Sequence, residues 1–113
     1  MHELSLAMEV IHLAQSEAEK NNATEIQEIT IEVGDLCGVE AEAFESALGL
    51  LAKGSILGNS LIHILRTPGK GNCISCNHEF VMNHRMATCP ICHCFPSQIS
   101  GGTEFRVVSL LIE

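Results

Sequence analysis

The stretch Cys73-Ile74-Ser75-Cys76, followed twelve residues later by Cys89-Pro90-Ile91-Cys92, decides how this chain folds. Each Cys-x-x-Cys knuckle directs two sulfurs at one point, so two knuckles can surround a single cation. Four thiolates in a tetrahedron, at about 2.3 Å, are a ligand set that zinc prefers. We therefore predict a closed, structural zinc site made of Cys73, Cys76, Cys89 and Cys92, with a tight hairpin between the knuckles.

The same four cysteines also permit two other chemistries. Disulfides require an oxidising compartment, but the chain opens with Met1-His2-Glu3, and we expect neither an export signal nor a membrane span. A cytoplasmic protein, which we expect here, keeps its thiols reduced. A rubredoxin-like iron site stays open as an alternative, because knuckles of this type hold both metals.

Composition narrows the functional classes. The chain has 113 residues, 46% of them hydrophobic, and a net charge of −8 with only six Lys and Arg together. A nucleic-acid binder needs a basic face, so this acidic chain is not expected to bind nucleic acid. It also lacks a phosphate-binding glycine loop and a His-Glu-x-x-His motif, and we find no nucleophile–base pair. We therefore predict that it is not an enzyme.

Apolar periodicity predicts an α+β fold in which two helices lie on a three-stranded sheet. The helices are expected at about 3–20 and 40–53, and the strands near 29–33, 60–67 and 104–112. Segment 104–112 is nearly apolar on both faces, so we expect it in the centre of the sheet. Residues 1–69 and 98–113 then form an α/β domain, and residues 70–97 form an inserted zinc ribbon. Lys70-Gly71-Asn72 is expected to be a short linker into the ribbon, and a second glycine-containing linker, Ser100-Gly101-Gly102, leads out of it.

His2 offers a second metal site at the amino terminus. The Met1 amine, the amide nitrogen of His2 and its imidazole can hold one ion through fused chelate rings, and such planar nitrogen coordination suits nickel(II) or copper(II). A fourth donor would be the Glu3 amide, water or another histidine. An ordinary surface histidine explains the same residue, so the motif by itself leaves both interpretations open.

Three stretches together closely resemble the HypA/HybF family of nickel-insertion accessory proteins for NiFe-hydrogenase maturation. They are Met1-His2-Glu3-Leu4-Ser5, the segment 32–40, and the late Cys-x-x-Cys pair ending in Cys-Pro-x-Cys-His. The match runs in order and spacing over nearly all of the chain. The resemblance implies a nickel site on His2 with the Met1 amine, a separate structural zinc site on the four cysteines, and an α/β domain with an inserted zinc ribbon.

The resemblance also implies a function and partners. We expect a nickel metallochaperone that works with a nickel-handling maturation GTPase and a hydrogenase large-subunit precursor and, in some members, with urease maturation proteins. Neither a nucleic acid nor a membrane is expected as a partner. A zinc-ribbon protein–protein adaptor, with His2 idle, and a rubredoxin-like electron carrier are the alternatives.

Three residues beside these motifs have open roles. His93 follows the second knuckle and is a candidate additional nickel donor, although a histidine that hydrogen-bonds beside the zinc site, or a solvated one, is the simpler explanation. Cys94 is an extra thiol, expected to be free beside the ribbon, with substitution into the zinc site or binding of a second soft metal as the alternatives. Glu3 has its backbone next to the proposed nickel, and its carboxylate could hold the imidazole or a partner.

Overall fold

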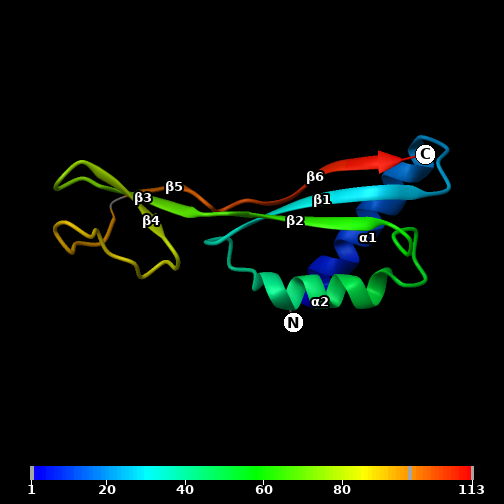
Figure 1. Ribbon diagram of the computed structural model, residues 1–113, viewed down its shortest axis with the longest axis horizontal. Coiled ribbons are helices and arrows are strands. Elements are labelled where there is room, and N and C mark those ends of the chain that lie inside the picture. Colours follow the sequence, from blue (N-terminus) through cyan, green and yellow to red (C-terminus); the bar gives the residue numbers. More distant parts are fainter. Residues whose placement is uncertain (1, 97, 113) are drawn as a thin grey trace. The chain divides into compact units, whose positions relative to one another are not determined.

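The computed structural model describes residues 2–96 and 98–112 and has the predicted α+β class (Figure 1). Its elements in chain order are α1 (His2–Lys20), β1 (Ile26–Gly34), α2 (Ala41–Ala52), β2 (Leu61–Thr67), β3 (Gly69–Cys73), β4 (His78–Met82), β5 (Gln98–Gly101) and β6 (Phe105–Ile112). The two helices and the three longer strands lie where the apolar periodicity placed them. Strands β3, β4 and β5 were not predicted individually.

The chain forms two compact units. The first, which we call the helical unit, comprises Met1–Ile31, Val39–Leu65 and Arg106–Glu113. The second, which we call the ribbon unit, comprises Glu32–Gly38 and Arg66–Phe105. The predicted ribbon, 70–97, lies inside this second unit, which also includes a segment from the first third of the chain.

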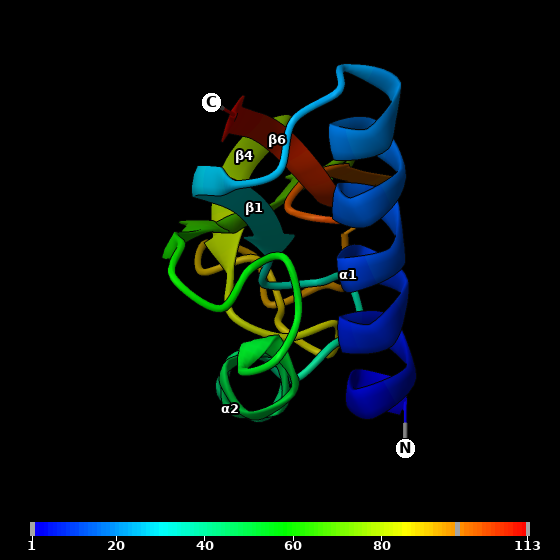
Figure 2. The ribbon, with the colours of Figure 1, turned by 90° about the vertical axis from the view of Figure 1, so that its right-hand side faces the viewer.

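Helix α1 contributes small side chains to the core of the helical unit. Its buried residues recur at steps of three and four and are Ala7, Val10, Ala14 and Ala18. The larger Leu4 and Leu13 are 47% and 46% exposed. Small residues on the buried face allow a close approach of the packed elements, and α1 packs directly on α2 (Figure 2).

Helix α2 begins at a defined cap. The carboxylate of Glu40, the N-cap residue, accepts a hydrogen bond of 2.9 Å from the backbone N–H of Ala43. This bond satisfies one of the amide groups that have no partner within the first turn. The buried face of α2 comprises Ala41, Phe44, Leu48 and Ala52, and Phe44 and Leu48 are fully buried.

Strands β1 and β2 run parallel. The His63 Nε2 and Glu28 Oε1 atoms lie 2.7 Å apart, and Thr67 donates a 2.7 Å hydrogen bond to Glu32. Both pairs join residues 35 positions apart, and a constant offset of this kind is the signature of parallel pairing. Helix α2 is therefore the crossover that a parallel pair requires.

The predicted place of the last strand is wrong. The order of the first sheet is β2-β1-β6, so β1 is central and β6 lies at an edge (Figure 1). Strand β1 supplies the deeply buried Ile29, Ile31 and Val33, whereas Val108 and Leu111 of β6 are 44% and 50% exposed. Apolar residues on both faces of a strand thus did not indicate burial on both sides.

The second sheet has the order β4-β3-β5, and its central strand was expected to be a linker. Strand β3 pairs antiparallel with β4 from Gly69↔Met82 to Cys73↔His78, and with β5 through Lys70↔Gly101. Two glycines of β3 allow close packing: a Cβ at Gly69 would collide with Leu36, and one at Gly71 would collide with Met82. The expected glycine linkers are therefore paired strands, whose glycines admit neighbouring side chains.

No helix within the described part of the chain is long and apolar enough to cross a membrane.

Candidate metal centre

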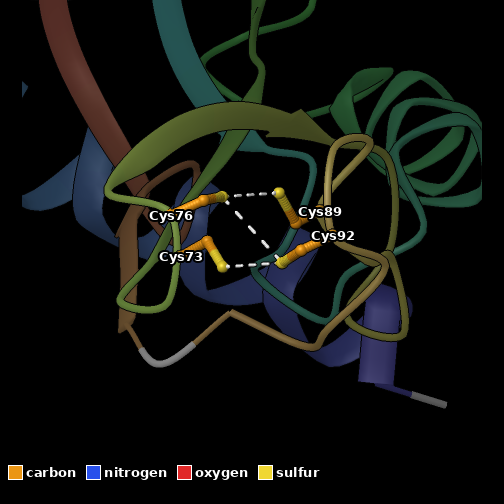
Figure 3. Close-up of side chains that lie close together, drawn as sticks. All are labelled: Cys73, Cys76, Cys89 and Cys92. Carbon is orange, nitrogen blue, oxygen red and sulfur yellow. Dashed lines mark hydrogen bonds between the residues drawn. The ribbon is translucent and has the colours of Figure 1, made fainter.

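The sulfurs of Cys73, Cys76, Cys89 and Cys92 converge on one point in the ribbon unit (Figure 3). Their Sγ atoms all lie within 4.8 Å of one another. The shortest separations are 3.2 Å between Cys73 and Cys92 and 3.4 Å between Cys76 and Cys89. We call this group the four-cysteine cluster.

These distances fit a metal better than disulfides. A disulfide places its sulfurs about 2.05 Å apart, and all four cysteines are free thiols. A tetrahedron of sulfurs, each about 2.3 Å from zinc, has edges of about 3.8 Å, close to the observed separations. Four protein sulfurs complete such a coordination sphere, so the geometry fits a closed, structural site.

Hydrophobic packing holds the cluster in place. Cys73 and Cys89 are buried and belong to a small core that also contains Leu36, Phe80 and Met82. Cys76 and Cys92 are half-buried and pack against this core. One cysteine of each knuckle is therefore anchored in the interior of the ribbon unit, and the other lies nearer to solvent.

The two knuckles share a local geometry. The residue after each second cysteine has a positive φ, 54° at Asn77 and 62° at His93. Asparagine and histidine tolerate this left-handed conformation better than most side chains. At the first knuckle the turn connects β3 to β4, so the hairpin closes at that knuckle and not, as predicted, in the interval between the knuckles.

Within each knuckle the two thiols differ in acidity. The backbone N–H of Cys76 is the main cause that lowers the pKa of Cys73 to about 7, and the backbone N–H of Cys92 likewise lowers the pKa of Cys89. The thiol of Cys89 is the main cause that raises the pKa of Cys76 to about 11. The thiolate, the form that binds metal, is thus favoured at the first cysteine of each knuckle relative to the second.

Neighbouring groups shift the pKa of Cys92 in opposite directions. The backbone N–H of Cys94 acts to lower its pKa, but the thiols of Cys73, Cys94 and Cys89, together with burial, outweigh that effect and raise the pKa to about 12. Several thiols that share hydrogen bonds cannot all ionise without a cation. A bound dication would remove this conflict.

Residues 32–38 belong to the ribbon unit, whereas the sequence predicts them in the α/β domain. Leu36 is 2% exposed, its N–H donates to the Gly102 carbonyl at 2.7 Å, and its own carbonyl accepts a 2.6 Å hydrogen bond from Arg85. In the sequence, the apolar Leu-Cys stretch in a loop flanked by Gly34 and Gly38 was the feature that indicated burial of this segment. An apolar loop must enter some core, but spacing alone did not identify which one.

The predicted terminal site is described only in part, since the Met1 amine lies outside the described residues. His2 is exposed at the first position of α1. The Glu3 Oε2 atom accepts a 3.1 Å hydrogen bond from the backbone N–H of Glu40, and this bond is the main cause that lowers the pKa of Glu3. His93 is exposed in the ribbon unit, where its N–H donates to the Cys89 carbonyl, and its role as a nickel donor stays a prediction.

The fold and the cluster together define a small α+β protein with a ribbon built around a metal-binding set of thiols. The chain belongs to the HypA family: residues 1–112 match the family described as "Hydrogenase/urease nickel incorporation, metallochaperone, hypA". This is a family of maturation factors and metallochaperones and not of enzymes, which confirms the prediction of a non-enzymatic protein.

Individual relatives match along the entire chain. A protein named hydrogenase maturation factor HypA from Parabacteroides distasonis is 36% identical over 113 residues, covering 100% of this chain and 98% of its own. One of the same name from Dechloromonas aromatica is 34% identical, with 100% of both chains covered. These matches confirm the resemblance found in the sequence.

Solved structures have the same fold. The solution structure of the Ni metallochaperone HypA from Helicobacter pylori superposes with a TM-score of 0.64 at 26% identity, covering 97% of this chain and 96% of that one. A second solution structure, of a HypA protein, gives a TM-score of 0.66 at 26% identity, covering 100% and 97%.

Proposed function

We propose that this protein is a nickel metallochaperone that binds Ni(II) at its amino terminus, carries a structural Zn(II) in the four-cysteine cluster, and delivers nickel during NiFe-hydrogenase maturation. Membership of a nickel-incorporation family supports the general role. The observation that carries the assignment of sites is their contrast: a closed set of four sulfurs in the ribbon unit, and an exposed His2 in the helical unit.

The two sets of metal donors suit two different roles, the retention of zinc and the transfer of nickel. Four thiolates fill every position of a tetrahedral zinc and hold it firmly. A terminal chelate of amine, amide and imidazole nitrogens suits nickel and leaves a position for the Glu3 amide, water or a donor from another protein. Nickel at an exposed terminus can therefore leave by ligand exchange while zinc stays in the ribbon.

Glu3 gives the terminal site a fixed support. Its carboxylate is held by the Glu40 N–H, so the first turn of α1 is tied to the start of α2. A chelate that uses the backbone at positions 2 and 3 needs such a fixed backbone, because each ordered donor lowers the entropy lost on binding.

The partners we propose are a nickel-handling GTPase and a hydrogenase large-subunit precursor, with urease maturation proteins as further recipients. The family description names both hydrogenase and urease. The net charge of −8 favours a metal cation and partners with basic surfaces.

Calorimetric titration of the zinc-loaded protein with nickel tests the proposal. The native chain beginning at Met1 should bind one nickel ion, whereas His2→Ala and a chain extended by one amino-terminal residue should lose that site. His12→Ala is the matched control, because His12 is another exposed histidine of α1. Equal nickel binding by all four proteins would place the nickel site elsewhere and favour a ribbon adaptor with an idle His2.

A further inference from the structure

We propose that Cys94 is a reserve ligand of the four-cysteine cluster, which replaces Cys92 on the bound metal when Cys92 leaves it. This inference rests on the zinc site proposed above. It assigns a task to a fifth thiol that a tetrahedral site of four sulfurs leaves unused.

The backbone folds Cys94 back onto the second knuckle. The Cys89 N–H donates to the Cys94 carbonyl at 2.8 Å, and the His93 N–H donates to the Cys89 carbonyl at 2.8 Å. The positive φ of His93, 62°, produces the turn between the two cysteines. Segment 89–94 is therefore a closed loop whose last residue is fastened to its first, and not the start of a departing strand.

The loop brings a fifth sulfur within reach of the metal position. Two chain steps of 3.8 Å limit the separation of the Cys92 and Cys94 Cα atoms to about 7.6 Å. The N–H and the thiol of Cys94 are both among the neighbouring groups that shift the pKa of Cys92. Cys94 is exposed, whereas Cys92 is half-buried.

The exchange conserves charge and electrons. The bond from zinc to the Cys92 sulfur breaks as a bond from zinc to the Cys94 sulfur forms, and the Cys94 thiol proton passes to the departing Cys92 thiolate. The site holds four thiolates before and after, and no oxidant is required. Two residues after Cys76 the chain has His78 and not a cysteine, so the first knuckle has no thiol in the corresponding position.

Cobalt(II) substitution measures the exchange, since the charge-transfer absorbance of this ion reports the number of bound thiolates. The variant Cys92→Ser should keep a four-thiolate spectrum, whereas Cys92→Ser combined with Cys94→Ser should lose about a quarter of that absorbance. Cys76→Ser is the matched control and should lose a thiolate although Cys94 is present. Identical three-thiolate spectra for the Cys92 single and double variants would overturn the proposal.

The rate of zinc release tests the proposal in a variant that keeps all four proposed zinc ligands, so that misfolding of the ligand variants cannot explain the result. Zinc release to an excess of chelator should be severalfold faster from Cys94→Ser than from the native chain, because the reserve ligand is missing. Cys37→Ser, a thiol outside the second knuckle, should leave the rate unchanged. Equal rates for Cys94→Ser and the native chain would contradict the inference, while a native protein that binds neither zinc nor cobalt would refute the zinc site itself.

Discussion

The carboxylate of Glu3 accepts a 3.1 Å hydrogen bond from the backbone N–H of Glu40, a residue 37 positions away that also caps α2. Glu3 lies next to the proposed nickel ligand His2. The bond thus links the residue that follows the terminal site to the start of the second helix.

Replacement of Glu3 should loosen the terminus. In Glu3→Ala the Glu40 N–H loses its acceptor, so its hydrogen exchange should accelerate and nickel affinity should fall by about tenfold. Glu3→Gln retains a carbonyl oxygen and should show a smaller effect on both. Amide exchange measured by NMR, with nickel calorimetry alongside, checks this. Glu9→Ala, an exposed change farther along α1, is the control; unchanged exchange at Glu40 in Glu3→Ala would be the contrary result.

The Glu3–Glu40 bond should depend on pH in the acid range. The Glu40 N–H lowers the pKa of Glu3 below its ordinary value of 4.5. The ionised carboxylate is therefore favoured in the folded chain. The stabilisation that the Glu3–Glu40 bond gives to the folded chain is fully present above pH 4.5 and is lost as the pH falls through the lower pKa of the folded state. A carboxyl NMR titration of the intact protein should show this, with a peptide of the first eight residues as reference. Titration of Glu3 at or above the peptide's value would refute the prediction.

Removal of zinc should unfold the ribbon unit, including its early segment. Structural zinc supplies apparent binding free energies of about 10–16 kcal/mol, comparable to the stability of a whole small domain. After chelation, amides of β3, β4 and β5 should lose protection, and so should the Leu36 N–H, which donates to Gly102. Protection in α1 should persist, and added zinc should restore the rest. A Leu36 amide that stays protected without zinc would show that segment 32–38 does not depend on the metal.

Truncation of Leu36 should destabilise the ribbon unit, although Leu36 is far in sequence from the cysteines of its core. Leu36 is 2% exposed in the core that contains Cys73 and Cys89, and removal of such a buried leucine side chain costs about 2–5 kcal/mol. Urea unfolding of the zinc-loaded protein should show this loss for Leu36→Ala. Leu50→Ala, at a residue of α2 that is 69% exposed, should change stability by no more than about 0.5 kcal/mol. Similar losses for the two variants would contradict this assignment of the core.

Several features could be predicted because their physical cause is local. The spacing inside each knuckle fixes where two sulfurs point, and the three- to four-residue period of α1 and α2 fixes which side is apolar. Both causes act over a few residues, so the sequence alone sufficed. The predictions failed where the cause was a neighbour far along the chain: the glycines of β3 resemble a linker until Leu36 and Met82 occupy the space that a Cβ would fill.

The amino-acid sequence by itself determined the α+β class, both helices, the strands 29–33, 60–67 and 104–112, and the set of cysteines that converge, because periodicity and chelate spacing are short-range properties. Only the tertiary structure decided that β1 is the central strand, that segment 32–38 belongs to the ribbon unit, and that Glu3 is bound by Glu40. Each of these depends on which distant segments share a sheet or a core. That choice follows from the packing of the whole chain, and no local pattern encodes it.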